Sequence, residues 1–226
     1  MRELEHNVVS ILYSLKGLIE SHLELAREGD AGQKEFVSKH AEDVLRRAYS
    51  QADQALQITK RLGQVLEPPQ ESPQREMKVS LNQVWDEVLR ALEKEYPLGG
   101  MEILCRIPLN FPGIHCAERD FKEILYNLAE NAVQAMNGSG KLVIRAQLAF
   151  SVKEESFAVI TLADTGHGIA GEKLPHLFDP FFTTKDSNGS GLGLYLAKML
   201  ASRNGGKISV CSFEGCGSTF TLEFPV

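Results

Sequence analysis

A cluster of prolines divides the chain into two parts with different residue patterns. No proline occurs before position 68, whereas the segment EPPQESPQRE holds three prolines within six residues. Proline lacks a backbone donor and interrupts helices, and the polar residues around it cannot form a core. We therefore expect two domains, residues 1–67 and 76–226, joined by a linker at residues 68–75.

The first domain has the apolar spacing of a helical bundle. Its apolar residues recur in steps of three and four, which predicts helices that each bury one face. A polar break, REGDAGQKE, separates two such stretches, so an antiparallel helical hairpin is expected. Because a hairpin leaves apolar surface uncovered, we expect a homodimer that forms a four-helix bundle. The spacing in the first stretch is carried by Leu4, Val8, Ile11, Leu15, Leu18 and Leu25.

The second domain mixes strand and helix patterns. KLVIRAQLAF and FAVITLAD alternate as strands do, ERDFKEILYNLAENAVQAM and LYLAKMLASR are helical, and GKISVCSF and STFTLEFPV predict a hairpin around EGCG. The pattern predicts an α+β fold in which helices and a sheet form a two-layer sandwich.

Composition narrows the function classes. The formal charge of −6 argues against a general nucleic-acid binder, which usually carries a basic face. No apolar run is long enough to cross a bilayer and the start of the chain does not resemble a secretory signal, so we expect a cytoplasmic chain without a membrane segment. The four cysteines form no CxxC pair and are interpreted as reduced packing residues.

Two motifs in the second domain carry amide and carboxylate groups. In NLAENAVQAM, Asn127 and Asn131 share one helix face, and an amide oxygen can ligate Mg²⁺, although such a pair is more often a solvated face. In DTGHGI, Asp164 ends a predicted strand and can accept a hydrogen bond from an exocyclic amine. Gly166 and Gly168 would let the backbone approach a flat ring; the alternative is a plain turn.

Two further motifs are an aromatic segment and a glycine-rich loop. FDPFFTTK contains Phe178 and ends at Lys185, which supplies local positive charge in an acidic chain. SNGSGLGL contains Gly189, Gly191 and Gly193 directly before a predicted helix. Unpaired amides at a helix N-terminus favour phosphate groups, so the loop predicts a phosphate site, with a simple turn as the alternative.

The order of these four motifs resembles the Bergerat-type ATP-binding fold of histidine kinases, gyrase-type topoisomerases, Hsp90 and mismatch-repair ATPases. FFTTKDSNGSGLGL, GGKISV and GSTFTLEFP are especially similar to sensor histidine kinases. The resemblance implies that Mg²⁺ and ATP are bound, with Asp164 at the adenine, Asn131 at the metal and the glycine loop around the phosphates. The nucleotide-binding residues expected on this basis are Asn127, Asn131, Asp164, Gly166, Gly168, Phe178, Lys185, Gly189, Gly191, Leu192, Gly193 and Thr219.

The resemblance also points to a kinase. ATP-hydrolysing relatives have a glutamate where this chain has Asn127, and a carboxamide cannot activate water as a base. Another group should accept the γ-phosphoryl group, and His6 lies near the start of the first helix, as the acceptor of histidine kinases does. Asn7 replaces the family's common acidic residue, so autophosphorylation is expected to be slow or conditional. Ser10 stands where Asn or Thr often orients the water that dephosphorylates a partner response regulator, and whether Ser10 supports this phosphatase activity is left open.

The expected function is thus a dimeric histidine kinase core that phosphorylates His6 and passes the group to an aspartate in the receiver domain of a response regulator. A second reading is a signalling scaffold or phosphotransfer adaptor whose nucleotide domain only changes conformation, and Asn7 favours it. A third is a serine kinase of the anti-sigma type, which would share the pocket and would not need the histidine.

Overall fold

The chain divides into two compact units, Met1–Glu67 and Pro68–Val226. The computed structural model describes residues 78–150, 156–183 and 191–226, together with Tyr13, Leu15, Lys16, Gly17, Ile19, Glu20, Ser21, His40 and Ala48 of the first unit, all nine of which are helical. Apart from these nine, the predicted hairpin lies outside the described residues. Among the helices that are described, none combines the length and the apolar composition needed to cross a membrane.

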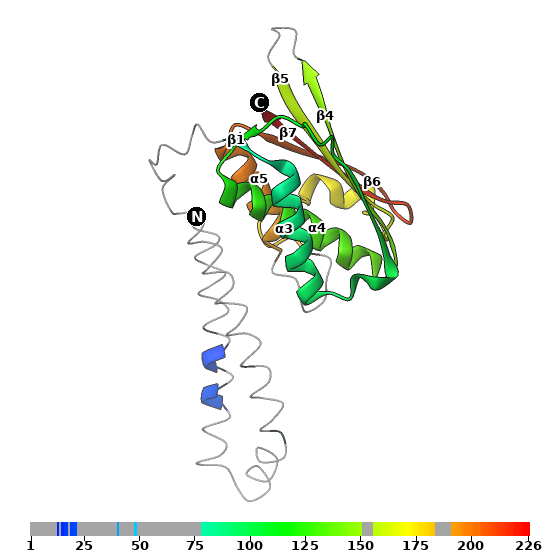
Figure 1. The fold of residues 1–226 in the computed structure, drawn as a ribbon. Helices are drawn as coiled ribbons and strands as arrows, with labels where there is room; N and C mark the ends of the chain where they lie inside the picture. The colour runs from blue at the N-terminus through cyan, green and yellow to red at the C-terminus, as the bar shows by residue number, and fades with distance from the viewer. Residues whose placement is uncertain are drawn as a thin grey trace, which may run out of the picture. The chain divides into compact units, whose positions relative to one another are not determined.

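The second unit alternates helices and strands, as Figure 1 shows. Ser80 caps the first of its helices by accepting a hydrogen bond from the backbone N–H of Gln83, and the left-handed conformation of Asn137 ends the longest one. The elements are β1 (Lys78–Val79), α3 (Leu81–Glu95), the 3₁₀ turn η2 (Leu98–Gly100), β2 (Met101–Arg106), β3 (Ile114–His115), α4 (Glu118–Met136), β4 (Gly140–Phe150), β5 (Ser156–Asp164), η3 (Gly171–His176), α5 (Gly193–Arg203), β6 (Lys207–Phe213) and β7 (Gly217–Pro225).

Five strands form one mixed sheet in the order β2-β4-β5-β7-β6. β2 runs parallel to β4, and the remaining pairs are antiparallel. The predicted hairpin around EGCG is present, with Phe213 opposite Gly217. The segment GIHCA contributes only the short strand β3, which pairs with β1 in a separate two-stranded sheet.

Helices α3, α4 and α5 cover one face of the sheet, so the described part of this unit is the α+β sandwich that the sequence predicts. Alternate residues of the central strands face the helices and are buried, which follows from the two-residue repeat of a strand. Phe224 of β7 meets Phe121 of α4 edge to face, with ring centroids 5.5 Å apart. The buried apolar residues of the five-stranded sheet are Leu142, Ile144, Ala146, Ala158, Ile160, Leu162, Phe220, Leu222 and Phe224.

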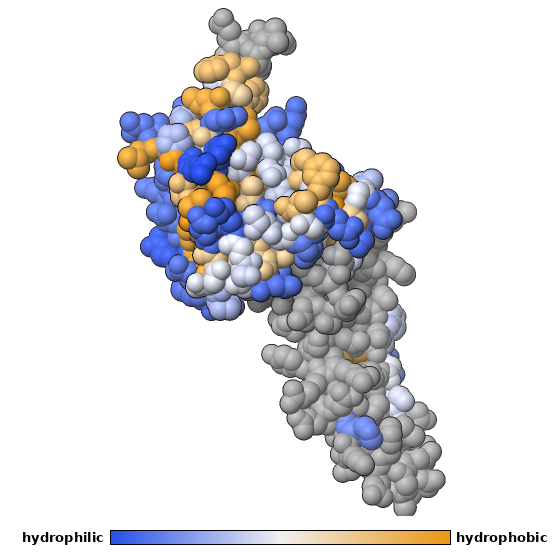
Figure 2. Space-filling view, turned by 90° about the vertical axis from the view of Figure 1, so that its right-hand side faces the viewer, coloured by the Kyte–Doolittle hydropathy of each residue, from blue (hydrophilic) through white to orange (hydrophobic). Residues whose placement is uncertain are grey.

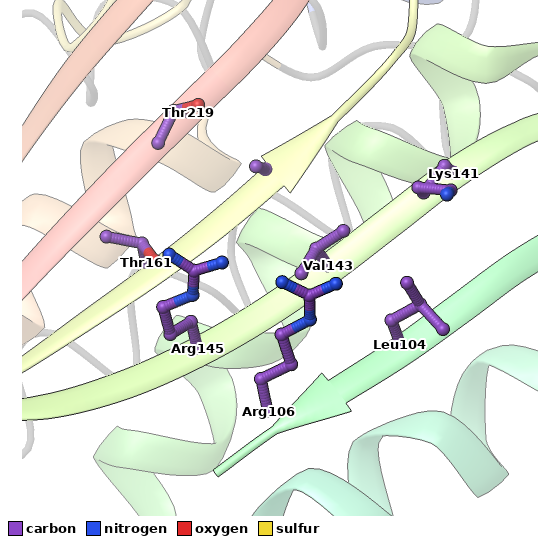
Figure 3. A pocket seen from close by; sticks show the side chains of 8 residues that line it. Leu104, Arg106, Lys141, Val143, Arg145, Thr161 and Thr219 are labelled. Carbon is purple, nitrogen blue, oxygen red and sulfur yellow. The ribbon is translucent and has the colours of Figure 1, made fainter.

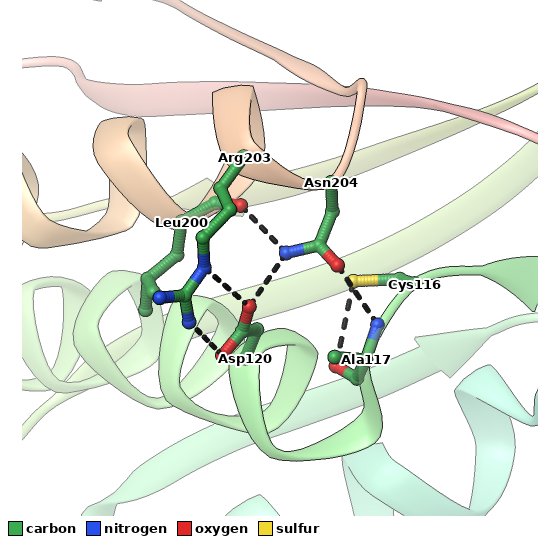
Figure 4. Close-up of polar contacts among 6 residues, drawn as sticks. All are labelled: Cys116, Ala117, Asp120, Leu200, Arg203 and Asn204. Atoms are coloured by element: carbon green, nitrogen blue, oxygen red, sulfur yellow. Dashed lines mark hydrogen bonds and ion pairs between the residues drawn. The ribbon is translucent and has the colours of Figure 1, made fainter. Parts of the chain in front are cut away.

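A polar cluster joins the start of α4 to the end of α5 (Figure 4). The Arg203 guanidinium donates two hydrogen bonds to the Asp120 carboxylate, at 2.6 and 3.1 Å. The Asn204 side chain donates to the same carboxylate at 2.7 Å and accepts from the backbone N–H of Ala117 at 2.9 Å. Asp120 is buried, so these bonds compensate its lost hydration and fix α4 relative to α5.

Candidate functional site

Asp164 ends β5 and presents a carboxylate from the buried side of the sheet. Its Oδ1 accepts hydrogen bonds from the backbone N–H groups of Gly166, at 2.9 Å, and Ser218, at 3.3 Å. Burial raises the pKa of Asp164 above its ordinary value, and the two backbone hydrogen bonds oppose this shift. Within the described residues Oδ2 receives no hydrogen bond, so this oxygen is available to a ligand that carries an N–H donor.

The two positions Gly166 and Gly168 require glycine, because backbone atoms of other segments lie where a Cβ would be. A Cβ on Gly166 would lie 2.7 Å from the carbonyl oxygen of Ala135 in α4, and the adjacent His167 N–H donates to that same oxygen at 3.2 Å. Gly168 has φ +68°, and a Cβ there would lie 2.0 Å from the carbonyl oxygen of Phe213. The segment that follows Asp164 is therefore held between α4 and the end of β6.

Two asparagines of α4 lie on the helix face that meets this segment. Asn127, Asn131 and Ala135 follow one another at intervals of four, and Ala135 contacts Gly166. Asn127 is buried, and its Nδ2 donates to the backbone carbonyl of Glu123 at 2.8 Å and to its carboxylate at 3.3 Å. These bonds occupy its Nδ2 donor, and no described residue donates to its amide oxygen, which is therefore available to a ligand. The structure thus brings both asparagines and Asp164 to one side of the sheet.

The aromatic segment and the start of α5 pack against each other. The Lys198 ammonium lies 5.4 Å from the centroid of the Phe178 ring, a cation–π contact. Gly191 has φ +62°, and a Cβ there would lie 2.4 Å from the carbonyl carbon of Phe181. Phe181 itself has φ +66°, in the left-handed region that few residues other than glycine adopt. The two described ends of the connection between η3 and α5 therefore meet at Phe181 and Gly191.

Helix α5 begins at Gly193, and among the described residues no side chain caps its first turn. Leu192, which occupies the cap position, is buried. The first backbone N–H groups of a helix lack partners within the helix and carry partial positive charge. An N-terminus without a side-chain cap suits an anionic group such as a phosphate.

The structure does not bring Thr219 to this site. Thr219 lines the face of the sheet opposite the helices, whereas Ser218 is buried on the helix side and its backbone N–H donates to Asp164. The buried residues Phe220, Leu222 and Phe224 alternate along β7, so the same alternation in the sequence predicts that Ser218 faces inward.

Sequence reasoning also missed Glu123, which orients Asn127 from one helical turn earlier. Five of the predicted site residues lie outside the described residues: His6, Asn7, Ser10, Lys185 and Gly189.

Comparison with known proteins places these features in context. Residues 116–226 match the family model described as histidine kinase-, DNA gyrase B- and HSP90-like ATPase. The sensor histidine kinase ZraS of Escherichia coli (strain K12) is 30% identical over 223 residues, which cover 98% of this chain and 44% of ZraS. The chain therefore spans less than half the length of that relative.

Solved structures of one histidine kinase, ThkA, share the fold. The nucleotide-free catalytic domain of ThkA is 26% identical with a TM-score of 0.57, over 66% of this chain and 94% of that domain. ThkA in complex with the response regulator protein TrrA has a TM-score of 0.61 at 19% identity, over 99% of this chain and 60% of that one.

Proposed function

We propose that this chain is a kinase core that phosphorylates itself on His6, because residues 116–226 match the family model of the histidine kinase-, DNA gyrase B- and HSP90-like ATPases and the chain's relatives are sensor histidine kinases. ATP is the phosphoryl donor, and an aspartate of a response regulator is the final acceptor. The observation that carries the proposal is the half-satisfied carboxylate of Asp164 beside the asparagine face of α4.

The adenine recognition follows from the donors around Asp164. Oδ1 is held by the amides of Gly166 and Ser218, which fixes the plane of the carboxylate. Oδ2 then accepts a hydrogen bond from the exocyclic amine of adenine, and in a buried position this bond discriminates against bases without that amine. Ser218 replaces Thr219 in the nucleotide-binding set.

The phosphates lie toward α5. Its first turn, which starts at Gly193 and which no described side chain caps, and the preceding Gly191 supply backbone amides, and Lys185, Gly189 and Leu192 belong to the same loop. Asn127 and Asn131 carry amide oxygens, which are hard ligands of the kind that Mg²⁺ accepts, so the chemistry of these side chains fits the metal. Bound Mg²⁺ would neutralise charge on the phosphates.

Transfer to a histidine is favoured over hydrolysis because Asn127 cannot serve as a base toward water. A ring nitrogen of His6 attacks the γ-phosphorus, the bond from phosphorus to the bridging oxygen breaks, and ADP leaves with the bonding electrons. The ring proton passes to solvent. Asn7 accepts a hydrogen bond from the ring without offering a formal charge, so this step is slower than with a carboxylate, and Ser10 holds a water for dephosphorylation of the partner.

The two units have separate roles in this proposal. Residues 1–67 form the helical hairpin that dimerises, carries His6 and docks the response regulator, residues 68–75 are a linker, and residues 76–226 bind ATP. The similarity to ThkA, whose structure with TrrA is a kinase and response regulator complex, supports such a partner.

Incubation of the full chain with γ-labelled ATP tests the proposal. We expect label that is lost in acid and retained in base, as phosphohistidine is, and no label in His6→Gln. His40→Gln, which changes a histidine of the same unit, should retain the label. Label that persists in His6→Gln would reassign the acceptor, and acid-stable label would indicate a serine kinase. ATP binding without any label would indicate the scaffold.

A further inference from the structure

The face of the sheet opposite the helices contains a hollow of about 400 Å³ that the nucleotide site does not use. Its walls are side chains of β2, β4, β5 and β7 that point away from the helices (Figure 3). Ala163 and Thr219 line it, whereas their sequence neighbours Asp164 and Ser218 point to the nucleotide side. The hollow and the nucleotide site therefore lie on opposite faces of the same strands.

Two arginines lie next to each other in this hollow. Arg106 of β2 and Arg145 of β4 are direct partners in the parallel register, so both side chains leave the same face from strands about 5 Å apart. Figure 3 shows their guanidinium groups side by side and pointing the same way. Among the described residues, no carboxylate forms an ion pair with either, whereas Lys141 in the same hollow pairs with Glu102 at 2.9 Å. Like charges on neighbouring strands repel, and an anion between them would remove that repulsion.

The register places an apolar row directly beside the arginines. Leu104, Val143 and Ala163 are consecutive partners across β2, β4 and β5, two residues along each strand from the arginine row. All three line the hollow. In Figure 2 the described surface of this unit carries hydrophobic and hydrophilic residues next to one another. A ligand here meets two positive groups at one end and an apolar floor at the other.

A threonine hydroxyl lies in the same row as the two arginines. Thr161 of β5 is the register partner of Arg145 and lines the hollow with it. Arginine and threonine together offer N–H and O–H donors in a line, which suits the oxygens of a carboxylate, sulfonate or phosphate. The volume is at the lower end of the range for small-molecule sites, so the hollow is sized for a compact ligand.

We propose that this hollow binds a small free organic anion, with its acidic group between Arg106 and Arg145 and an aromatic or short aliphatic body on Leu104, Val143 and Ala163. The chain has a formal charge of −6, so the paired arginines are a local reversal of its overall charge. The guanidinium pair recognises the acidic group, and the apolar row selects a ligand with a non-polar body over an inorganic ion.

Calorimetric titration of the full chain with phenyl phosphate tests this proposal. We expect saturable binding that is weakened at least about tenfold by Arg106→Gln and by Arg145→Gln, because each removes charge-assisted hydrogen bonds. Lys207→Gln is the matched control, since Lys207 is an exposed cation on β6, outside the residues that line the hollow, and its removal should leave the affinity unchanged. Phenol, which keeps the ring without the charge, should bind far more weakly.

Further outcomes separate the hollow from other sites. Excess Mg²⁺ and ATP should leave phenyl phosphate binding intact, and if they abolish it while the arginine variants do not, the anion occupies the nucleotide site and the proposal is wrong. Absence of binding at millimolar concentration, or equal affinity in both arginine variants and the wild type, would also overturn it. Fluorescence of Trp85, the single tryptophan and a buried one, verifies that each variant is folded.

Discussion

Replacing Gly168 by alanine should lower the free energy of unfolding of the second unit by far more than the cost of placing an alanine in a left-handed conformation. Gly168 has φ +68°, and a Cβ at this position would lie 2.0 Å from the carbonyl oxygen of Phe213. Gly215 offers a matched control, because it has φ +78° and open space where a Cβ would lie. Both substitutions carry the penalty of a left-handed alanine, and only the first adds a collision with backbone.

The expected sizes follow from these two contributions. A left-handed conformation costs a non-glycine residue about 1 to 2 kcal/mol, so Gly215→Ala should lower the free energy of unfolding by about 1 kcal/mol. Contacts below 3.0 Å are essentially absent around real Cβ atoms, so in Gly168→Ala the loop and the end of β6 must separate by about 1 Å. Overpacking of this kind adds about 1 to 3 kcal/mol, for a total near 3 to 4 kcal/mol.

Urea unfolding followed by Trp85 fluorescence measures both effects, because the only tryptophan lies buried in α3 of the same unit. With a slope near 2 kcal/mol per molar urea, the midpoint should fall by about 0.5 M in Gly215→Ala and by more than about 1.5 M in Gly168→Ala. Equal shifts in the two variants would show that the contact with Phe213 does not constrain the loop, and would refute the reasoning.

Two further predictions concern charged groups. Arg203→Gln leaves the buried Asp120 carboxylate without its bidentate partner and should cost about 3 kcal/mol in urea unfolding, whereas Glu87→Gln breaks a largely exposed ion pair and should leave the midpoint unchanged. Burial raises the pKa of Asp164 in the folded protein above its value in the unfolded chain, so the folded state binds this proton more tightly. The stability that this gives is fully present below the pKa of the unfolded chain and is lost as the pH rises through the pKa of the folded protein. Asp164→Asn should therefore gain stability relative to wild type as the pH rises above about 4, the ordinary pKa of an aspartate, and a difference that is constant with pH would contradict this.

The architecture of the second unit was predictable because its core follows simple repeats. Alternation in KLVIRAQLAF and FAVITLAD corresponds to β4 and β5, and the hairpin around EGCG corresponds to β6 and β7. Asp164 could be located at a strand end because a turn-forming Asp-Gly pattern follows apolar alternation. The parallel pairing of β2 with β4 was not predictable, since it depends on contacts between distant segments.

The site was only partly predictable for the same reason. A shift of one residue along a strand exchanges its faces, so choosing Thr219 in place of Ser218 moved the predicted contact to the wrong side of the sheet. The roles of Gly166 and Gly168 depend on α4 and β6, which a local motif does not reveal. The assignments of His6, Asn7 and Ser10 remain predictions.

Calorimetric titration of the full chain and of Asp164→Asn with ATP and Mg²⁺ tests the central claim most directly. In the variant the amide oxygen can keep the hydrogen bonds from Gly166 and Ser218, and an NH₂ group then replaces Oδ2 and opposes the amine of adenine donor to donor. The account predicts that wild type binds one ATP per chain and that the variant binds about 100-fold more weakly or not at all. Equal affinities, or no binding by wild type, would contradict it.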